Sequence, residues 1–319
     1  MESPSFVRLP SLHDREIDAE VARLSAPTSP PPPADFAAFW LETLAQARAI
    51  PVASKLTPSA AAMTGFEVQE IAFTSWGRVR LRGWLATPRH QPVRRGLVIS
   101  HGYGGRDAPD AIPLLPDAAM IFPCTRGLGL SIDPADRDAA PHVLRGIGSR
   151  DTYIFRGCAA DVWAAATALI EHVPAAADCL DYVGSSFGGG IGALALPWDD
   201  RFRRAFLGVP SFGHHPLRLQ IPCAGSGEFV RRYAATHPEV VDVLRYYDAA
   251  TAARFLERPT LVECALIDDV VPPVGQFAVH AALAGDRPLL VRSRSHADYP
   301  AATADDDAVR TAIRSFLTS

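Results

Sequence analysis

The 319-residue sequence lacks the features of several protein classes. It has no run of about 18 apolar residues, so it offers no candidate membrane-spanning helix. It has no long basic run either, and its formal net charge is only -4. Neither nucleic acid nor an anionic membrane surface is therefore an expected partner. No internal repeat is visible.

Cysteine is scarce, and its spacing is irregular. The five cysteines form no paired pattern, which is typical of reduced, mostly buried thiols and not of a disulfide scaffold. The first residues, Met1-Glu2-Ser3-Pro4, lack the basic and apolar regions of a signal peptide. We therefore expect a cytoplasmic protein. With 48% hydrophobic residues, the chain can bury the core of one elaborated α/β domain.

Prolines divide the chain into an N-terminal arm and a main body. The run Pro30 to Pro33 is stiff and extended, so we assign residues 1–33 to the arm and 34–319 to one domain. Asp35 is placed to cap the helix that follows it.

From Leu97 onward, short apolar strands alternate with helices. This alternation predicts a mostly parallel sheet with helices on both faces. Antiparallel strands are expected earlier, over Phe66 to Leu85. The C-terminal helix begins near Asp305. The expected buried face of that helix consists of Val309, Ile313 and Phe316, and the expected parallel strands are 97–100, 119–122, 180–183, 205–209, 261–267 and 289–291.

The segment 212–254 is too long for a simple connection and has helical patterning, so we predict a small helical cap there. The adjacent pair His214-His215 belongs to this cap, because neighbouring histidines rarely share a metal ion without further ligands. The three acids Asp305-Asp306-Asp307 suit a helix N-terminus better than a metal site. We expect no metal and no cofactor.

The most informative motif is Gly184-Ser185-Ser186-Phe187-Gly188. It lies between an apolar strand, Leu180 to Val183, and a glycine- and alanine-rich helical segment. A G-x-S-x-G sequence in this context is the tight turn that presents the nucleophile in α/β-hydrolases. Small flanking residues are needed because neighbouring backbone comes too close for a side chain. The motif selects Ser186 as the nucleophile.

A serine nucleophile needs a base, and in this fold the acid and then the histidine follow it along the chain. His296 comes just after an apolar strand, whereas His280 falls within a helical stretch and is expected on the helix surface. Catalytic groups lie in loops beyond the carboxyl ends of strands, which favours His296. By the same rule Asp268 is the expected acid, although spacing alone does not exclude Asp269.

An oxyanion hole requires two N–H donors. The first is expected from Phe187, the residue after the nucleophile, and the second from the loop that follows an early strand. The turn His101-Gly102-Tyr103-Gly104-Gly105 provides that loop, with Tyr103 as donor. We interpret His101 as a loop-packing residue, since no second metal ligand is spaced to join it. The combined pattern predicts acyl transfer from an ester to water.

Further short motifs cover the chain from about residue 33 to the C-terminus. The clearest are the arginine-glycine pairs, the glycine-tyrosine pair and the D-x-V-x-P-P sequence at Asp268; the set consists of 33–40, 80–85, 101–103, 125–127, 145–147, 153–156, 246–248 and 268–273. In this set the sequence resembles the acetyl xylan esterase and cephalosporin C deacetylase family, carbohydrate esterase family 7.

The resemblance implies hydrolysis of acetyl esters on small or oligomeric sugars, and sometimes of cephalosporins, without a cofactor and often by a ring-like hexamer. It also implies that Arg126 orients the loop near the oxyanion hole, and it places Tyr103, Arg126 and Leu128 at the substrate. The sequence departs from the family where Phe187 and Leu128 replace glutamines and where Ala297 replaces an acidic residue.

Two other functions remain open from the sequence. The first is hydrolysis of larger acyl groups or peptides, which the same catalytic residues would support. The second is a hydrolase fold retained only for binding, although such proteins commonly lose a member of the triad.

Overall fold

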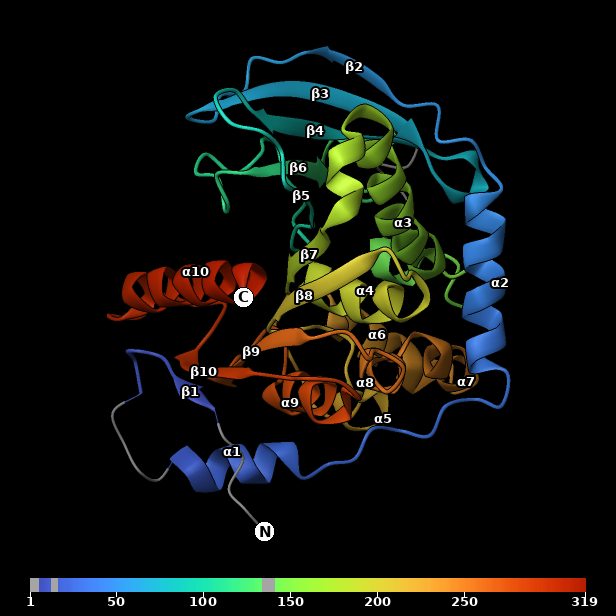
Figure 1. Ribbon diagram of the computed structural model, residues 1–319. Helices are drawn as coiled ribbons and strands as arrows, with labels where there is room; N and C mark the ends of the chain where they lie inside the picture. Colours follow the sequence, from blue (N-terminus) through green and yellow to red (C-terminus); the bar gives the residue numbers. More distant parts are fainter. Residues whose placement is uncertain (1–5, 13–16, 134–140) are drawn as a thin grey trace.

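The computed structural model describes residues 6–12, 17–133 and 141–319. Within them a ten-stranded sheet forms the centre, in the order β1-β10-β9-β8-β7-β5-β6-β4-β3-β2 (Figure 1). Its strands are β1 (Val7–Arg8), β2 (Lys55–Pro58), β3 (Phe66–Thr74), β4 (Arg80–Pro88), β5 (Arg95–Ile99), β6 (Ala118–Pro123), β7 (Leu180–Ser185), β8 (Phe202–Gly208), β9 (Thr260–Ile267) and β10 (Leu289–Arg294).

The sheet is parallel from β1 to β6 in spatial order, and β4, β3 and β2 join it antiparallel. Both predictions are confirmed, because the early strands form an antiparallel part and the later strands a parallel one. The turn between β3 and β4 contains Gly77 at φ 72°. The parallel strands inside the sheet are largely buried on both faces, as crossover helices require, whereas the edge strand β1 is exposed.

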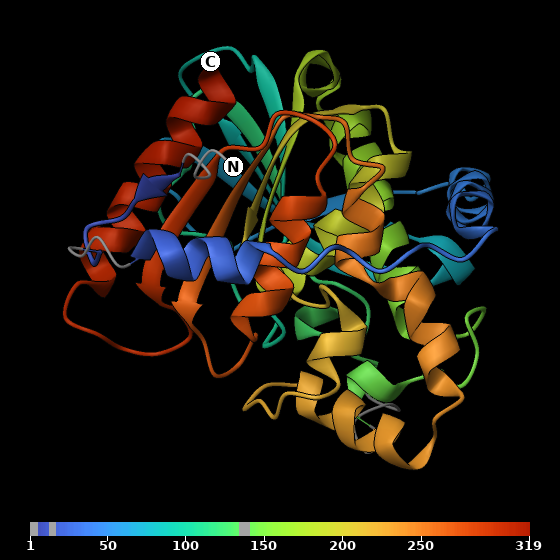
Figure 2. The same cartoon turned by 90° about the horizontal axis from the view of Figure 1, so that it is seen from below.

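Helices cover both faces of the sheet (Figures 1 and 2). Most pack on one face, and α10 lies on the other. The longer helices are α1 (Ile17–Ser25), α2 (Phe36–Arg48), α3 (Ile154–His172), α4 (Phe187–Ala195), α6 (Gly227–Thr236), α9 (Pro273–Ala282) and α10 (Ala302–Thr318).

Alternation along the strands divides the buried side chains into two cores. In β9, Val262 and Cys264 face the core beneath α9, whereas Leu261 faces the core beneath α10. In β5, Val98 and Leu97 divide in the same way. Because the central strands β5 to β9 are largely buried on both faces, their carboxyl ends are a fixed platform for the loops that follow.

The predicted cap segment contains four short helices and a 3-10 turn. These are α5 (His215–Arg218), α6, α7 (Val240–Leu244), η7 (Arg245–Tyr247) and α8 (Ala249–Ala253). α8 contacts α4 and α9, so this part of the segment is anchored to the main body. In Figure 2, α6 and α7 extend away from the sheet. The role of the segment as a cap stays a prediction.

Part of the predicted arm packs on the domain. β1 extends the sheet beside β10, and α1 contacts α9. Residues 1–5 and 13–16 of the arm lie outside the described residues. No helix in the described part of the chain combines the length and apolar character that crossing a membrane requires.

Two expectations about single residues were wrong. Asp35 precedes α2, but its carboxylate accepts hydrogen bonds from Arg150 and the Tyr246 hydroxyl and does not cap the helix. His280 is buried, with Nε2 bonded to the Arg287 carbonyl, and does not lie on the surface. In α10, which starts at Ala302, the expected face packs on the core with Phe316 partly buried, and Leu317 is buried beside it.

Candidate active site

Ser186 occupies the sharp turn between β7 and α4. Its backbone angles are φ 54° and ψ -116°, a region that L-residues rarely adopt and that costs roughly 1–3 kcal/mol. A Cβ at Gly184 would lie 2.7 Å from the Gly188 carbonyl oxygen. The turn therefore requires the small residue that the motif supplies. As a result, the Ser186 side chain stands above the carboxyl edge of the sheet.

His296 lies in the loop just after β10. Its Nε2 is 3.0 Å from Ser186 Oγ, and its Nδ1 is 2.8 Å from Asp268 Oδ2. The loop is fixed to the neighbouring strand end, because the Ser295 N–H donates to the Ile267 carbonyl. The structure thus brings together the three residues that the sequence singled out, although they are separated by up to 110 positions.

The Asp268 carboxylate is fully enclosed, with 0% of its side chain exposed. Its Oδ1 accepts the N–H groups of Val270 and Val271, both at 2.9 Å. Asp269, in contrast, is 81% exposed and pairs loosely with Arg294 at 3.9 Å. Of the two aspartates that spacing left open, Asp268 is the one that the structure places against His296.

Gln276 is a site residue that the sequence reasoning missed. It is completely buried in α9, and its amide nitrogen donates to Asp268 Oδ2 at 2.9 Å and to the Val271 carbonyl at 2.7 Å. Its amide oxygen accepts the Ala265 N–H at 2.8 Å. An amide among apolar residues of a predicted helix, eight positions after the acid, was a usable signal.

The two proposed oxyanion donors lie on neighbouring segments. Phe187 is the first residue of α4, where backbone N–H groups have no partner within the helix. Tyr103 lies in a turn closed by the hydrogen bond from Gly105 N–H to the Gly102 carbonyl. The Tyr103 and Phe187 rings meet edge to face at 5.7 Å. A Cβ at Gly188 would approach the His101 carbonyl to 3.0 Å, so helix and loop are closely packed.

Aromatic side chains fill the space around Phe187. Its ring contacts Tyr103, His142, Phe155 and Phe212, with centroid distances of 5.6 to 6.0 Å. Phe187 is only 2% exposed. We call these five residues the aromatic cluster. The phenylalanine that replaces the family glutamine is thus a packing residue.

Two buried histidines hold the loops on this side of Ser186. His101 donates from Nδ1 to the Gly102 carbonyl and accepts the Thr125 N–H at Nε2. His142 donates from Nε2 to the Arg126 carbonyl. Burial lowers the pKa of each to about 4, so both imidazoles are neutral at pH 7. The loop-packing interpretation of His101 agrees with these contacts.

The expected substrate contact of Arg126 is not supported. Its guanidinium is buried and donates to both oxygens of Asp161, to Ser75 Oγ and to the Trp76 carbonyl. It orients these segments and has no contact with the site cavity. Leu128 is likewise a core residue, only 8% exposed.

A cavity of about 360 Å³ opens beside Ser186 and His296 on the α10 side of the sheet. Apolar residues form its floor, and charged residues surround them. The charged lining residues are Asp110, Glu263, Arg292, Asp306 and Arg310. Arg292 joins Glu263 at 2.8 Å and Asp306 at 2.9 Å, so most of this charge is internally paired.

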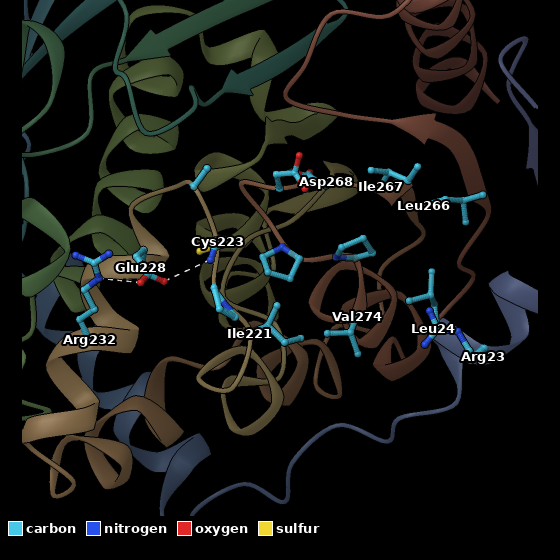
Figure 3. Close-up of a pocket in the computed structure, with 15 residues that line it drawn as sticks. Arg23, Leu24, Ile221, Cys223, Glu228, Arg232, Leu266, Ile267, Asp268 and Val274 are labelled. Carbon is cyan, nitrogen blue, oxygen red and sulfur yellow. Dashed lines mark hydrogen bonds and ion pairs between the residues drawn. The ribbon is translucent and has the colours of Figure 1, made fainter.

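A larger cavity of about 760 Å³ lies on the other side of the acid loop (Figure 3). Asp268 sits at its edge, while Ser186 and His296 are not among its lining residues. Within the part of the chain that the structure describes, no group of three or more histidine, cysteine, aspartate or glutamate residues is arranged to hold a metal ion. The chemistry therefore centres on the smaller cavity.

Comparison with known proteins identifies the family of this chain. The family model for acetyl xylan esterase (AXE1) matches residues 25–313. Acetyl xylan esterase 1 from Thermoanaerobacterium sp. JW/SL YS485 superposes with a TM-score of 0.79 at 20% identity, covering 92% of this chain and 98% of that one. The acetyl xylan esterase from Paenibacillus sp. R4 gives 0.80 at 20% identity, with coverages of 91% and 98%.

A more distant likeness extends to peptidases. The acylaminoacyl peptidase of Pyrococcus horikoshii matches with a TM-score of 0.61 at 14% identity, over 80% of this chain and 42% of that one. At this identity the likeness concerns the α/β-hydrolase fold alone. The family model, in contrast, matches nearly the whole chain. The chain therefore belongs to the acetyl xylan esterase family and is a carboxylic ester hydrolase of α/β-hydrolase fold.

Proposed function

We propose that this hydrolase removes acetyl groups from sugars or related small hydroxylated compounds through a serine acyl-enzyme. The observation that carries the proposal is the continuous hydrogen-bonded chain from Ser186 Oγ through His296 to Asp268. Each link has a length at which a proton can be passed or held. The three residues also occur in the order that this fold requires.

In the proposed mechanism, Ser186 Oγ attacks the ester carbonyl while His296 Nε2 takes the hydroxyl proton. The resulting imidazolium is stabilised by the Asp268 carboxylate, which stays ionised. His296 then returns the proton to the leaving alcohol as the carbon–oxygen bond breaks. In the second half, His296 takes a proton from the water that attacks the acetyl-enzyme. The bond between the acetyl carbon and Ser186 Oγ then breaks, His296 returns the proton to Oγ, and acetate leaves.

The backbone N–H groups of Phe187 and Tyr103 are the proposed donors to the tetrahedral oxyanion. Support comes from the position of Phe187 at the start of α4 and from the close packing of the Tyr103 turn against that helix. A side-chain change from glutamine to phenylalanine leaves the N–H in place. The polar network behind the hole must therefore differ from that of the family, while the donor itself is retained.

The cavity on the α10 side of Ser186 is our proposed site for the alcohol half of the ester. Its volume of about 360 Å³ falls in the range of small-molecule sites, roughly 300–1,000 Å³. The charged groups that surround it offer donors and acceptors to hydroxyl groups. Of the charged lining residues, Arg310 belongs to α10 and Asp110 to the loop after β5, so separate segments of the chain contribute to the lining.

The decisive experiment compares hydrolysis of p-nitrophenyl acetate and p-nitrophenyl butyrate by wild type and Ser186→Ala. We expect acetate to be preferred and the activity to fall by at least about 10³-fold in the variant. A preference for butyrate would keep the mechanism but favour larger acyl groups. No activity in wild type, or equal activity in both proteins, would contradict the Ser186 mechanism. Acetylated sugars and the acetyl ester of a cephalosporin are the next substrates.

We further propose a cytoplasmic, oligomeric enzyme. All five cysteines are free thiols, and three of them are buried, which agrees with a reducing compartment. The oligomer rests on the family resemblance, and light scattering of the purified protein tests it.

A further inference from the structure

A buried arginine in the cap segment lacks a counter-ion. Arg218, at the end of α5, is only 7% exposed. Across the described residues, its guanidinium has no carboxylate oxygen within 4.0 Å, and its one polar contact is Cys223 Sγ at 3.9 Å. Its Nε has no hydrogen-bond partner. Arginine does not give up its charge in proteins, so this is a buried cation without a bonded counter-ion.

One carboxylate acts on Arg218 electrostatically, but it makes its hydrogen bonds elsewhere. Asp248 is buried, and its Oδ2 accepts the His215 N–H at 2.5 Å while its Oδ1 accepts the Thr251 N–H at 2.9 Å. These bonds hold its carboxylate at the start of α8. Burial also lowers the pKa of the His215 imidazole to about 4, so that ring supplies no second charge at pH 7. Arg218 therefore has a negative charge in its surroundings but no counter-ion bonded to its guanidinium.

A small cavity has Arg218 in its wall. Its volume is about 20 Å³, and its lining also includes His215, Tyr153, Phe155 and Phe212. The Tyr153 hydroxyl is buried and also lacks a hydrogen-bond partner. Two residues with an unpartnered polar atom thus line one space, and the rest of the wall is mostly apolar.

The cavity volume limits what can enter. One water-sized particle needs about 10–15 Å³, so the space suits a single small species better than phosphate, sulfate or a carboxylate. A guanidinium and a hydroxyl both donate hydrogen bonds, so the occupant must accept them. A monovalent anion satisfies the donors and the charge together, whereas a water molecule satisfies only the donors.

We propose that this cavity is a binding site for one chloride ion, held by the Arg218 guanidinium and the Tyr153 hydroxyl. The ion joins the cap to the main body, because Arg218 and Gly227 come from the cap and Tyr153 directly precedes α3. The site is independent of the proposed hydrolysis. It adjoins the aromatic cluster through Phe155 and Phe212.

The test is thermal unfolding of the full chain at constant ionic strength, with sodium chloride replacing sodium gluconate. We expect Tm to rise with chloride and to level off, by about 2–5 °C in total, since a ligand that binds only the folded state stabilises it. Bromide should act in the same way. Ser186→Ala should show the same dependence, so failure of the hydrolysis proposal would not affect this result.

Variants locate the effect. Arg218→Met should remove the chloride dependence of Tm, and the exposed Arg254→Met is the matched control that should keep it. If Arg218→Met does not fold, Tyr153→Phe is the second variant. It should fold, and it should need several-fold more chloride to reach half of the full rise in Tm. A crystal grown in bromide should show an anomalous peak between Arg218 and Tyr153. Equal Tm in chloride and gluconate, with no bromide peak, would mean that the cavity holds only water and would overturn the proposal.

Discussion

Ser186 lies between two regions that are built in different ways. On one side His296, Asp268 and Gln276 are connected by side-chain hydrogen bonds of 2.8 to 2.9 Å. On the other side the aromatic cluster is held by ring contacts. Hydrogen bonds fix direction, whereas ring packing fixes shape and excludes water. The first region is suited to moving a proton, and the second to holding the oxyanion loops in place.

The histidines of the two regions show what this difference means chemically. His296 is 24% exposed at its side chain and has a carboxylate at Nδ1, so an imidazolium formed there is stabilised. His142 is buried, and its Nδ1 has no hydrogen-bond partner. Protonation of His142 would place an unpaired N–H in an apolar environment. The accessible histidine with an acid partner is thus suited to proton transfer, whereas the buried histidine without one is not.

The largest expected effect concerns the acid. Asp268→Asn should lower kcat for acetate esters by about 10³- to 10⁴-fold, because an amide no longer stabilises the imidazolium or selects the productive tautomer. Initial rates with p-nitrophenyl acetate measure this. The matched control is Asp269→Asn, which changes an 81% exposed neighbour and should stay within about twofold of wild type. Equal losses in the two variants would contradict the assignment of Asp268.

The second prediction concerns the aromatic cluster. Phe187→Ala should reduce the free energy of unfolding by about 3–5 kcal/mol, because it removes a ring that is 2% exposed. The backbone N–H remains, so kcat of the folded enzyme should fall much less than in Asp268→Asn. Urea unfolding and kinetics at low temperature separate the two quantities. If kcat fell as much as in Asp268→Asn while stability stayed unchanged, the aromatic cluster would have a catalytic role and not the packing role described above.

A smaller effect is expected at Gln276. Gln276→Leu removes the amide donor to Asp268 Oδ2, a bond to a charged group, and should lower kcat roughly tenfold. If Gln276 positions the catalytic acid, the variant should also show a changed pH profile of kcat/KM. A simple loss of stability would not change that profile. Gln220→Leu, on an exposed position of the cap segment, is the control. An unaltered pH profile in Gln276→Leu would show that the bond serves stability alone.

The region of His296, Asp268 and Gln276, which we call the polar region, was more predictable from sequence than the aromatic cluster. Ser186, Asp268 and His296 follow short apolar strands, and each strand end gives its position in the fold. The order of serine, acid and histidine along the chain then indicated the role of each residue. The parallel sheet was predictable for the same reason, since each strand is a local apolar run. Gln276 was missed because its role depends on the direction of a side chain within α9.

The aromatic cluster was not predictable, because its members come from five separate segments of the chain. Only the tertiary fold shows that Phe155 and Phe212 meet the ring of Phe187. The same limit explains the errors at Asp35 and His280. A capping position and an amphipathic pattern are local signals, and in both cases a distant partner determined where the side chain lies.

The smallest expected effect uses pH to compare the regions. Burial lowers the pKa of His142 to about 4, below its value in the unfolded chain of about 6.5. Between these values the unfolded chain binds a proton that the folded chain does not, so stability falls as pH falls through this window. From pH 7 to 5.5 this amounts to about 1 kcal/mol for one such histidine.

His142→Gln removes that titration while retaining an amide that can donate to the Arg126 carbonyl. The variant should therefore lose about 1 kcal/mol less than wild type between pH 7 and 5.5. Urea unfolding at a series of pH values measures the difference, and the interval from pH 7.5 to 8 serves as the internal control, since His142 is neutral in both states there. Parallel curves for the two proteins down to pH 5.5 would mean that His142 takes up a proton in the folded state. The aromatic cluster would then share the proton chemistry assigned here to the polar region alone.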